Sequence, residues 1–431
     1  MMEITVGQRE GDVVGDDGRA LQEAVDRAAA AGGGTVRVGP GVYPMADSLH
    51  LRSRVHVEGS GPETVLRKEP EVRCALAADL GYGHYDVSLA EPERFHTGMG
   101  VLVGDDRAGG FTLTVGTLTW REAERFGISR MLHHDYARSA NGFVASSFPL
   151  ISGEGIEDAS VARLAVDGNR AQNPTFLNGC RGGGVFLIRT RDVALRDLHV
   201  AHLNADGISF QQTVGTRIEE CVCEDNANHG LHPGSGSVGA VLRRCTCRRN
   251  GADGIYYCLR VSFSLCEECV IEANGRDGIS IGGRDTDHLV RRNAVRGNAR
   301  CGVFFRPHDR AMAGNRNRLE ENRVAGNCRA RGEGEVHIAA PLADVHLLRN
   351  RIRSLAPNVP GVRVAEGTEG VVVHDNTIEA DQPLVVEGEP EAVHRGPPPR
   401  ALEVGPEAAP PGAARHLALG PAEGRAAGAG P

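Results

Sequence analysis

The residues that could do chemistry are histidine, tyrosine and arginine side chains that recur about two dozen positions apart. His232 and Tyr256 are 24 positions apart, as are Arg260 and Arg284. Arginine offers a planar fork that neutralises a carboxylate, and a histidine and a tyrosine can act as acid and base. Once a uronate carboxylate is neutralised, its C5 hydrogen becomes acidic. The predicted chemistry is proton abstraction at C5 of a uronate, which ends in β-elimination or in C5 epimerisation.

Two sets of residues are predicted to form this site. The catalytic set is His232, Tyr256, Arg260, Arg284, Arg306 and His308. The substrate-binding set is Ser209, Gln211, Asp206, His229, Asp253 and Asp277. The three aspartates each precede a strand glycine, where forming a turn is their alternative role.

Two other kinds of protein remain open as alternatives. A glycoside hydrolase needs a general acid and a base at a defined separation, which Asp206, Asp253 or Asp277 would supply. A non-catalytic glycan-binding or spike-like protein would use His232 and Tyr256 only to cover an exposed sheet face.

Regularly spaced glycines show which elements must position these side chains. Six glycines each precede an aliphatic residue: Gly184, Gly207, Gly230, Gly254, Gly278 and Gly302. Successive glycines are separated by 23, 23, 24, 24 and 24 positions. Repeats of this length are typical of solenoid coils. Because side chains alternate faces along a strand, the residue after each glycine should point inward. The next residues should then point to solvent: Phe186, Ser209, His232, Tyr256, Ser280 and Phe304.

Other columns repeat with the same period and predict the rest of the coil. A second inward column is Leu195, Ile218, Leu242 and Cys266. A third is Leu198, Cys221, Cys245, Cys269 and Asn293, continuing with Asn322, Asn350 and Asn376. A further ladder, placed at a turn, is Asn226, Asn250, Asn274, Asn298 and Asn327. Stacked asparagines hydrogen-bond from coil to coil, so these columns should define the register.

The sequence therefore predicts an all-β, single-stranded, right-handed parallel β-helix. It forms one domain over residues 1–387, with an N-terminal capping helix from about Arg19 to Ala31 that Asp17 precedes. Residues from about 75 to 182 break the period and are predicted to form irregular coils with an inserted loop. Residues 388–431 are rich in proline, alanine and glycine and are predicted to be a disordered tail.

Two stretches carry a resemblance to known families. Gly33 to Tyr43 read GGTVRVGPGVY, which resembles the opening of the pectate-lyase-like superfamily, where a capping helix closes a right-handed β-helix. The central coils resemble bacterial alginate C5-epimerases, whose strand carries Asp-Pro-His-Glu. Here the aligned residues are His232, Pro233, Gly234 and Ser235, so the Asp and the motif His are not carried over. The resemblance implies the place of the site more than its reaction.

A comparison with polygalacturonases is weaker. Those enzymes carry Asn-Thr-Asp, paired aspartates and Gly-His-Gly on successive coils, and two of the three required carboxylates are missing here at the matching positions. Pectate lyases of the superfamily often bind calcium. Asp285 and Asp287 could contribute oxygen ligands to it, but we predict no cofactor and no metal site.

Composition limits the partners and the compartment. The net charge is −8 and Lys68 is the only lysine among 431 residues, which disfavours bulk nucleic-acid binding. Eleven cysteines, several in inward columns, are predicted to be core thiols rather than a metal cluster. The first ten residues show neither a basic leader nor an apolar run, and no stretch has the ~18 apolar residues of a membrane span, so neither a signal peptide nor a membrane span is predicted. We predict a cytoplasmic enzyme, secreted if a leader has been removed, that binds an acidic oligo- or polysaccharide, with no nucleic acid or membrane partner and with homo-oligomerisation left open.

Overall fold

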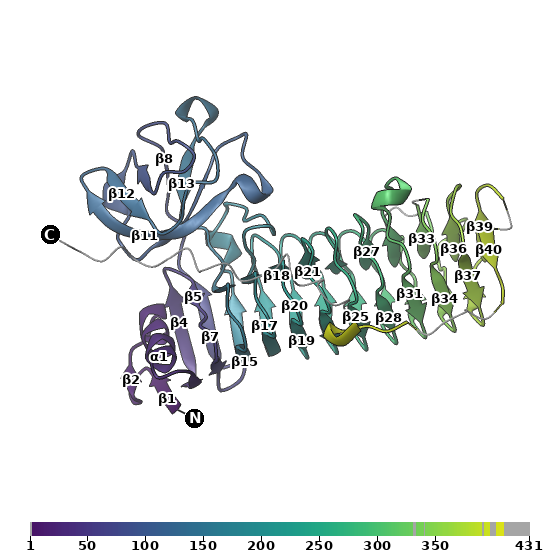
Figure 1. Cartoon of the computed structure of the whole chain (residues 1–431), viewed down its shortest axis with the longest axis horizontal. Coiled ribbons are helices and arrows are strands. Elements are labelled where there is room, and N and C mark those ends of the chain that lie inside the picture. The colour runs from purple at the N-terminus through teal and green to yellow at the C-terminus, as the bar shows by residue number, and fades with distance from the viewer. Residues whose placement is uncertain (1, 331–332, 340, 390–391, 397–401, 409–431) are drawn as a thin grey trace.

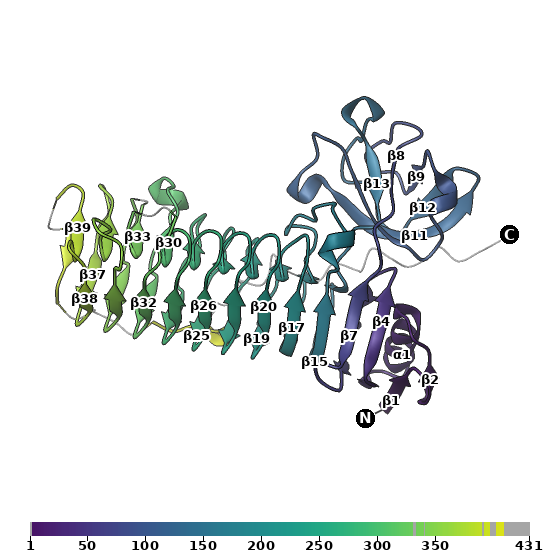
Figure 2. The same ribbon diagram turned by 180° about the vertical axis from the view of Figure 1, so that it is seen from behind.

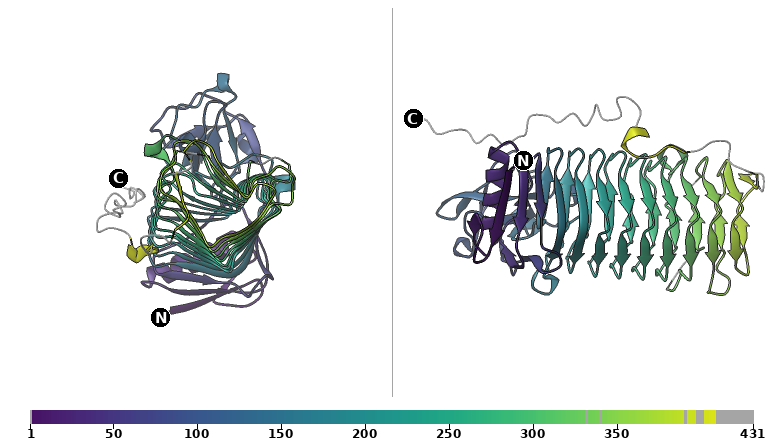
Figure 3. Two further views of the ribbon diagram at one scale, coloured as in Figure 1. Left: turned by 90° about the vertical axis from the view of Figure 1, so that its right-hand side faces the viewer. Right: turned by 90° about the horizontal axis from the view of Figure 1, so that it is seen from below.

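The computed structural model describes residues 2–330, 333–339, 341–389, 392–396 and 402–408. Short parallel strands stack coil upon coil into a long solenoid, and a smaller body rises from its N-terminal part (Figures 1 and 2). The view along the axis shows the coils superimposed around a common core (Figure 3, left). The predicted parallel β-helix is thus confirmed.

One helix covers the N-terminal end of the stack. Helix α1 (Gly18–Ala30) begins after Asp17, whose carboxylate accepts hydrogen bonds from the backbone N–H groups of Arg19 and Ala20. Its buried face, which includes Leu21 and Val25, packs against β1 and β3. An apolar face of this kind is what a solenoid needs to close its open core. Among the described residues, no helix is long and apolar enough to cross a membrane.

One face of the solenoid is a parallel sheet of eleven strands, here called the site face. Its strands are β5 (Leu49–His50), β14 (Ile151–Glu154), β16 (Val185–Ile188), β18 (Ile208–Gln211), β21 (Leu231–Gly234), β24 (Ile255–Tyr256), β27 (Ile279–Ile281), β30 (Val303–Phe305), β33 (Val336–Ile338), β36 (Val362–Val364) and β39 (Leu384–Val386). Val185, Ile208 and Leu231 are register partners in successive strands. The predicted inward column therefore has the expected alignment.

The remaining coil strands form a continuous sheet of 23 strands that wraps around the other sides. They are β1 (Met2–Gly7), β2 (Val13–Val14), β3 (Gly34–Val38), β4 (Gly41–Met45), β6 (Val55–Glu58), β7 (Thr64–Lys68), β15 (Ser160–Asp167), β17 (Ala194–Ala201), β19 (Arg217–Glu219), β20 (Val222–Glu224), β22 (Val241–Arg243), β23 (Thr246–Arg248), β25 (Leu265–Glu267), β26 (Val270–Glu272), β28 (Leu289–Arg291), β29 (Ala294–Arg296), β31 (Arg318–Glu320), β32 (Arg323–Ala325), β34 (His346–Leu348), β35 (Arg351–Arg353), β37 (Val371–His374), β38 (Thr377–Glu379) and β40 (Val393–His394).

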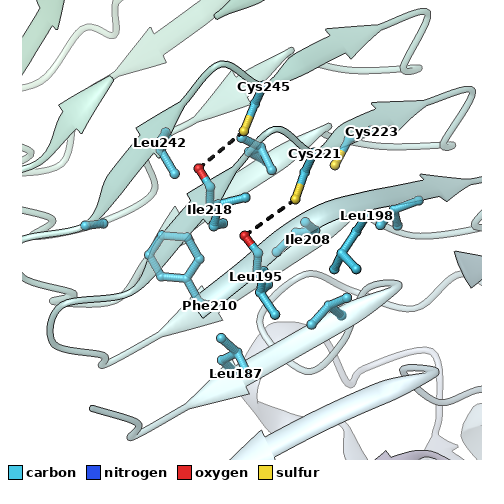
Figure 4. Packing of buried hydrophobic residues seen from close by; sticks show 14 of the residues in the cluster. Leu187, Leu195, Leu198, Ile208, Phe210, Ile218, Cys221, Cys223, Leu242 and Cys245 are labelled. Carbon is cyan, nitrogen blue, oxygen red and sulfur yellow. Dashed lines mark hydrogen bonds between the residues drawn. The ribbon is translucent and has the colours of Figure 1, made fainter. Parts of the chain in front are cut away.

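The interior of the coils is built from the predicted columns. Figure 4 shows leucine and isoleucine side chains stacked beside cysteines, with the Cys221 thiol donating to the Leu195 carbonyl and the Cys245 thiol to the Ile218 carbonyl. Cys221 and Cys245 are buried and free. These thiols act as small core residues, as expected.

Two asparagine ladders run along the stack inside its turns. The Nδ2 group of Asn250 donates to Oδ1 of Asn274 at 3.0 Å, and Asn274 donates to Asn298 at 2.9 Å. In the second ladder Asn322 donates to Asn350 at 2.9 Å. Each asparagine also satisfies backbone groups of the neighbouring coil, so buried polar atoms in the turns keep their partners.

The segment predicted to hold irregular coils and an inserted loop contains a regular antiparallel sheet, here called the inserted sheet. It has six strands: β8 (Arg73–Ala75), β9 (Asp86–Ser88), β10 (Gly100–Gly104), β11 (Thr114–Glu122), β12 (Arg125–Ile128) and β13 (Phe143–Ala145). Most of its buried residues, among them Val101, Phe126 and Tyr136, form a second core, whereas Leu102 and Leu113 pack with the core of the coils. The chain then returns to coil geometry at β14 and β15.

Part of the segment predicted to be a disordered tail is described by the structure. Strand β40 pairs with β37, and the backbone N–H of Gly405 donates to the carbonyl of Phe263 at 2.7 Å. The rest of the predicted tail, residues 390–391, 397–401 and 409–431, lies outside the described residues.

Candidate active site

A buried histidine–aspartate pair lies at the centre of the site face. His232 is the second residue of β21, and Asp206 occupies the turn before β18 in the preceding coil. Nδ1 of His232 lies 2.6 Å from Oδ2 of Asp206, and the two residues are 5% and 0% exposed. Asp206 also accepts hydrogen bonds from the Asn228 amide (2.7 Å) and from the backbone N–H of His229 (3.0 Å). These bonds hold the carboxylate in place against His232.

The pKa values of this pair indicate an ion pair. Burial alone would lower the pKa of His232, but the Asp206 carboxylate outweighs burial and raises that pKa to about 10. Burial alone would raise the pKa of Asp206, but His232 outweighs it and lowers that pKa. His232 is therefore a cation at neutral pH.

Tyr256 lies next to this pair, because Leu231 and Ile255 are register partners in neighbouring coils. Its ring lies 5.3 Å from that of His232, edge to face. On one side it stacks on His229 at 4.3 Å with an interplanar angle of 8°. The Arg306 guanidinium also contacts the ring, 4.3 Å from its centroid. Tyr256 is thus held by three side chains while remaining partly exposed.

Arg306 positions its neighbours and does not point freely to solvent. Its guanidinium donates to Ser280 Oγ (2.9 Å) and to the carbonyls of Tyr257 (2.6 Å) and Cys258 (3.1 Å). It also pairs with Asp285 at 3.3 Å. Both of its Nη groups therefore already have protein acceptors, which disfavours its predicted role of holding a substrate carboxylate.

The pKa of Tyr256 is raised, chiefly because burial disfavours the phenolate, although the Arg306 charge acts in the opposite direction. The phenol is consequently protonated at neutral pH. It can donate a proton directly, and it becomes a base only as the pH approaches this raised pKa.

Residues 178–183, here called the cover segment, lie over part of the predicted exposed column. The Gly179 carbonyl accepts from Ser209 Oγ at 2.6 Å, and Gln211 lies beside it. A side chain at Gly179 would collide with the Asp206 carboxylate and the His232 ring. The prediction that His232 and Ser209 face solvent is wrong, because the cover segment buries both of them, and Gln211, predicted to bind substrate, is buried with them.

The cover segment also brings in residues that the repeat pattern did not indicate. Cys180 and Cys258 are partly buried, and each thiol affects the pKa of the other. The Cys258 thiol is also among the groups that raise the pKa of His232. Cys258 lies two positions after Tyr256 in the same coil, but nothing in the sequence places Cys180 beside it.

The other predicted catalytic residues lie in the segments that follow β24, β27 and β30. Arg260 and Arg284 are exposed at the ends of adjacent coil strands. Within the described part of the chain their side chains have no ion pair. His308 is partly buried, and burial followed by the Arg306 charge lowers its pKa. Of the three predicted catalytic arginines, Arg260 and Arg284 are thus the ones available to an acidic ligand.

The remaining aspartates make hydrogen bonds that link coils. Asp253 Oδ1 accepts from the backbone N–H of Asp277 at 2.9 Å, and Asp277 Oδ1 accepts from that of Cys301 at 2.9 Å. Asp253 also lies 3.3 Å from His229. Burial, followed by the Asp253 charge, raises the pKa of Asp277 to about 7. These contacts are those of turn residues, the alternative left open for them.

The two residues considered for calcium bind arginine. Asp285 pairs with Arg306, and Asp287 receives two hydrogen bonds from Arg316, both of 2.8 Å. No group of three or more His, Cys, Asp or Glu side chains among the described residues is arranged to hold a metal ion.

The comparisons with known proteins agree with the coil geometry. Residues 159–310 match the family model described as the right handed beta helix region. The described strands and this match together define the chain as a parallel β-helix protein. Over 65 residues it is 46% identical to the mannuronan C5-epimerases AlgE2 and AlgE1 of Azotobacter vinelandii. That stretch covers 13% of this chain and only 6% and 5% of those two proteins.

Two solved structures share the fold over almost the whole chain. The A-module of the mannuronan C-5 epimerase AlgE4 of A. vinelandii superimposes with a TM-score of 0.57 and 16% identity, covering 91% of this chain and all (100%) of that module. The A-module of AlgE6 from the same organism gives 0.52 and 16%, covering 90% of this chain and 97% of that module. At this identity the likeness shows the fold.

Proposed function

We propose that the protein acts on a uronate-containing poly- or oligosaccharide by abstracting the C5 proton, as a polysaccharide lyase or a C5-epimerase. The observation that carries the proposal is the ion pair of His232 and Asp206 beside the ring of Tyr256. The local identity to mannuronan C5-epimerases supports the same class of substrate.

Each group has a role that follows from its contacts. Tyr256 is titratable and, unlike the buried His232 and Asp206, partly exposed, so it removes the C5 proton as phenolate. His232 and Arg306 place positive charge next to its ring and position it. Arg260 and Arg284 neutralise the substrate carboxylate, which makes the C5 hydrogen acidic.

The reaction balances in both outcomes. Breaking the C5–H bond leaves its electron pair on C5, delocalised into the carboxylate, and Tyr256 holds the proton. In elimination that pair forms the C4–C5 double bond, the C4–O bond breaks, and the leaving oxygen takes a proton. In epimerisation C5 receives a proton from water on the opposite face, and Tyr256 releases its proton to solvent. No oxidant or reductant is required.

The test is incubation of the protein with mannuronate, guluronate and galacturonate polymers. Ultraviolet absorbance detects unsaturated products, a reducing-end assay detects chain cleavage, and proton NMR detects a change of configuration. We expect unsaturation or epimerisation with at least one polymer, and Tyr256→Phe should lower the rate by roughly 10²–10⁴-fold. Tyr82→Phe, at a tyrosine exposed on the inserted body, serves as the matched control. No change in any polymer contradicts the proposal.

A glycoside hydrolase is the second candidate, favoured by one observation. The raised pKa of Asp277, about 7, is suited to a general acid. In that case new reducing ends would form without ultraviolet absorbance, and Asp277→Asn would abolish them while Tyr256→Phe would not.

A further inference from the structure

A pocket lies between the inserted sheet and the N-terminal coils. Its volume is about 290 Å³. Phe111, Arg130 and His133 come from the inserted body, and Phe186 and Arg189 come from the solenoid. Because the two bodies have separate cores, this pocket exists only where they meet.

The pocket has more positive than negative charge at neutral pH. Arg130 and Arg189 both pair with the single carboxylate of Glu154, from opposite oxygens. Burial lowers the pKa of His133 to about 4, so that ring is neutral. The other carboxylate in the lining, Asp47, already accepts from Thr117 Oγ1 at 2.6 Å. Two guanidinium groups thus share one carboxylate, and an additional anion in the pocket would be attracted to their remaining positive charge.

Arg181, in the cover segment, adds a third guanidinium. Its Nη2 group donates to the Phe111 carbonyl. Its Nε is buried and makes no hydrogen bond within the described residues. A buried guanidinium donor without an acceptor is costly, and an anionic oxygen is the acceptor that fits it best.

The pocket also offers apolar surface to a ring. Phe186 and Ile188 project from β16, and Phe148 lies beside them. Phe111, which is 40% exposed, is at the opposite wall. Aromatic surface next to arginines matches a sugar ring that bears a carboxylate.

The pocket and the candidate active site share one sheet face. Phe186 is the register partner of Ser209, and Ser209 of His232, with Tyr256 one coil further. At about 4.8 Å per coil, Phe186 and Tyr256 are about 14 Å apart. The cover segment joins the two places, because Arg181 lines the pocket while Gly179 packs on His232.

We propose that this pocket binds a carboxylate-bearing sugar residue of the same acidic glycan chain, as a subsite a few sugar units from the reacting one. The inference rests on the proposed function for the path of the glycan along the site face. The pocket's preference for an acidic sugar rests on the pocket's own residues. Arg181 of the cover segment is the main contact with the carboxylate, and Phe111 and Arg130 bring the inserted sheet and its loops into substrate selection.

The experiment is calorimetric titration of the full chain with mannuronate and galacturonate hexamers and with the same hexamers after reduction of their carboxyl groups. We expect at least one acidic hexamer to bind, and Arg181→Met to weaken it tenfold or more. Arg196→Met is the matched control, at an exposed arginine of β17 outside the site face, and it should leave the affinity unchanged. Arg189→Met provides a second variant at a less buried position, and thermal melting checks the folding of each.

Two results would overturn the inference: unchanged affinity in Arg181→Met and Arg189→Met, or equally tight binding of the reduced hexamers. Failure of the proposed function looks different. If the wild type binds acidic hexamers through Arg181 but never abstracts a C5 proton, the pocket stands and the reaction is wrong. If it reacts and Arg181→Met binds normally, the reaction stands and the pocket assignment is wrong.

Discussion

In the coils, residues at equivalent inward positions stack on one another from coil to coil and are often of the same kind, whereas the inserted sheet has no such repeat. Val185, Ile208 and Leu231 illustrate the first arrangement, in which the register follows from stacking like on like. The inserted sheet instead pairs β13 with both β8 and β10, segments of unrelated sequence. The repeating coils form a long, regular sheet surface. The inserted sheet and its loops line one side of the pocket at its N-terminal part.

The candidate site lies where the regular arrangement is interrupted. Ser209, His232 and Tyr256 occupy equivalent positions in three successive coils but differ in chemistry. The cover segment, which follows no period, buries two of them. The difference between the two regions thus suggests that the coils supply positions and the non-repeating segments supply selectivity.

The largest effect is expected from truncating one large core residue in each region, which shows whether the coils and the inserted sheet unfold independently. Phe210→Ala in the coils and Phe126→Ala in the inserted sheet each remove a side chain that is 0% exposed, and each should cost about 3–5 kcal/mol. Because the cores are separate, Phe126→Ala should accelerate hydrogen exchange in residues 73–145 and leave the coils protected. Accelerated exchange throughout the coils would show that the two bodies unfold together.

Breaking an asparagine ladder should cost less, and the cost should depend on position. Asn350 is buried and bonded to Asn322, Asn376 and the Leu319 carbonyl. Its replacement by alanine leaves buried groups unpaired, at about 1–3 kcal/mol for each group. Asn376 ends the ladder and is partly exposed, so Asn376→Ala is the control with the smaller effect. Urea denaturation measures both, and equal losses would argue against a ladder that acts through burial.

The ion pair of His232 and Asp206 should make stability depend on pH at the alkaline end. The pKa of His232 rises from 6.5 to about 10 in the folded protein, so its contribution is complete below about 6.5 and is lost as pH rises through about 10. Asp206 has a lowered pKa, so its contribution is present above 3.8 and is lost in acid. His232→Gln should flatten the decline between pH 6.5 and 10, whereas His84→Gln, at an exposed histidine, should not. Denaturation at several pH values between 6.5 and 10 measures how the free energy of unfolding changes with pH. The same pH dependence in His232→Gln and in the wild type would contradict the ion pair.

The smallest effect is expected at the junction between the two regions. Lys68 is 5% exposed, contacts the Phe148 ring, and has its pKa lowered to about 7 by burial. Because its folded pKa lies below its unfolded value, stability should rise with pH between about 7 and 10.5. Lys68→Met should remove this dependence and raise stability by about 1 kcal/mol near neutral pH. Thermal melting at pH 6 and pH 9 tests it, and destabilisation at both values would show that the amine is needed.

The repeating part of this fold could be predicted from the sequence, because one period determines many contacts. The glycine spacing located the strands, and the Asn226 ladder and the cysteine column followed from the same period. The adjacency of His232 and Tyr256 is a consequence of that register. The inserted sheet could not be predicted, since the pairing of Val101 with Gly116 depends on residues that no repeat relates. The burial of His232 under Gly179 and the approach of Cys180 to Cys258 depend on the same kind of non-repeating contact.

The most direct measurement is proton NMR of a uronate polymer incubated with the protein in D₂O. C5 proton abstraction by Tyr256 predicts either deuterium at C5 of epimerised residues or C4–C5 unsaturation at new chain ends. The rate should rise with pH, because burial raises the pKa of the Tyr256 phenol and the phenolate is the base. Polymer that is cleaved or bound while every C5 proton remains in place would contradict the account.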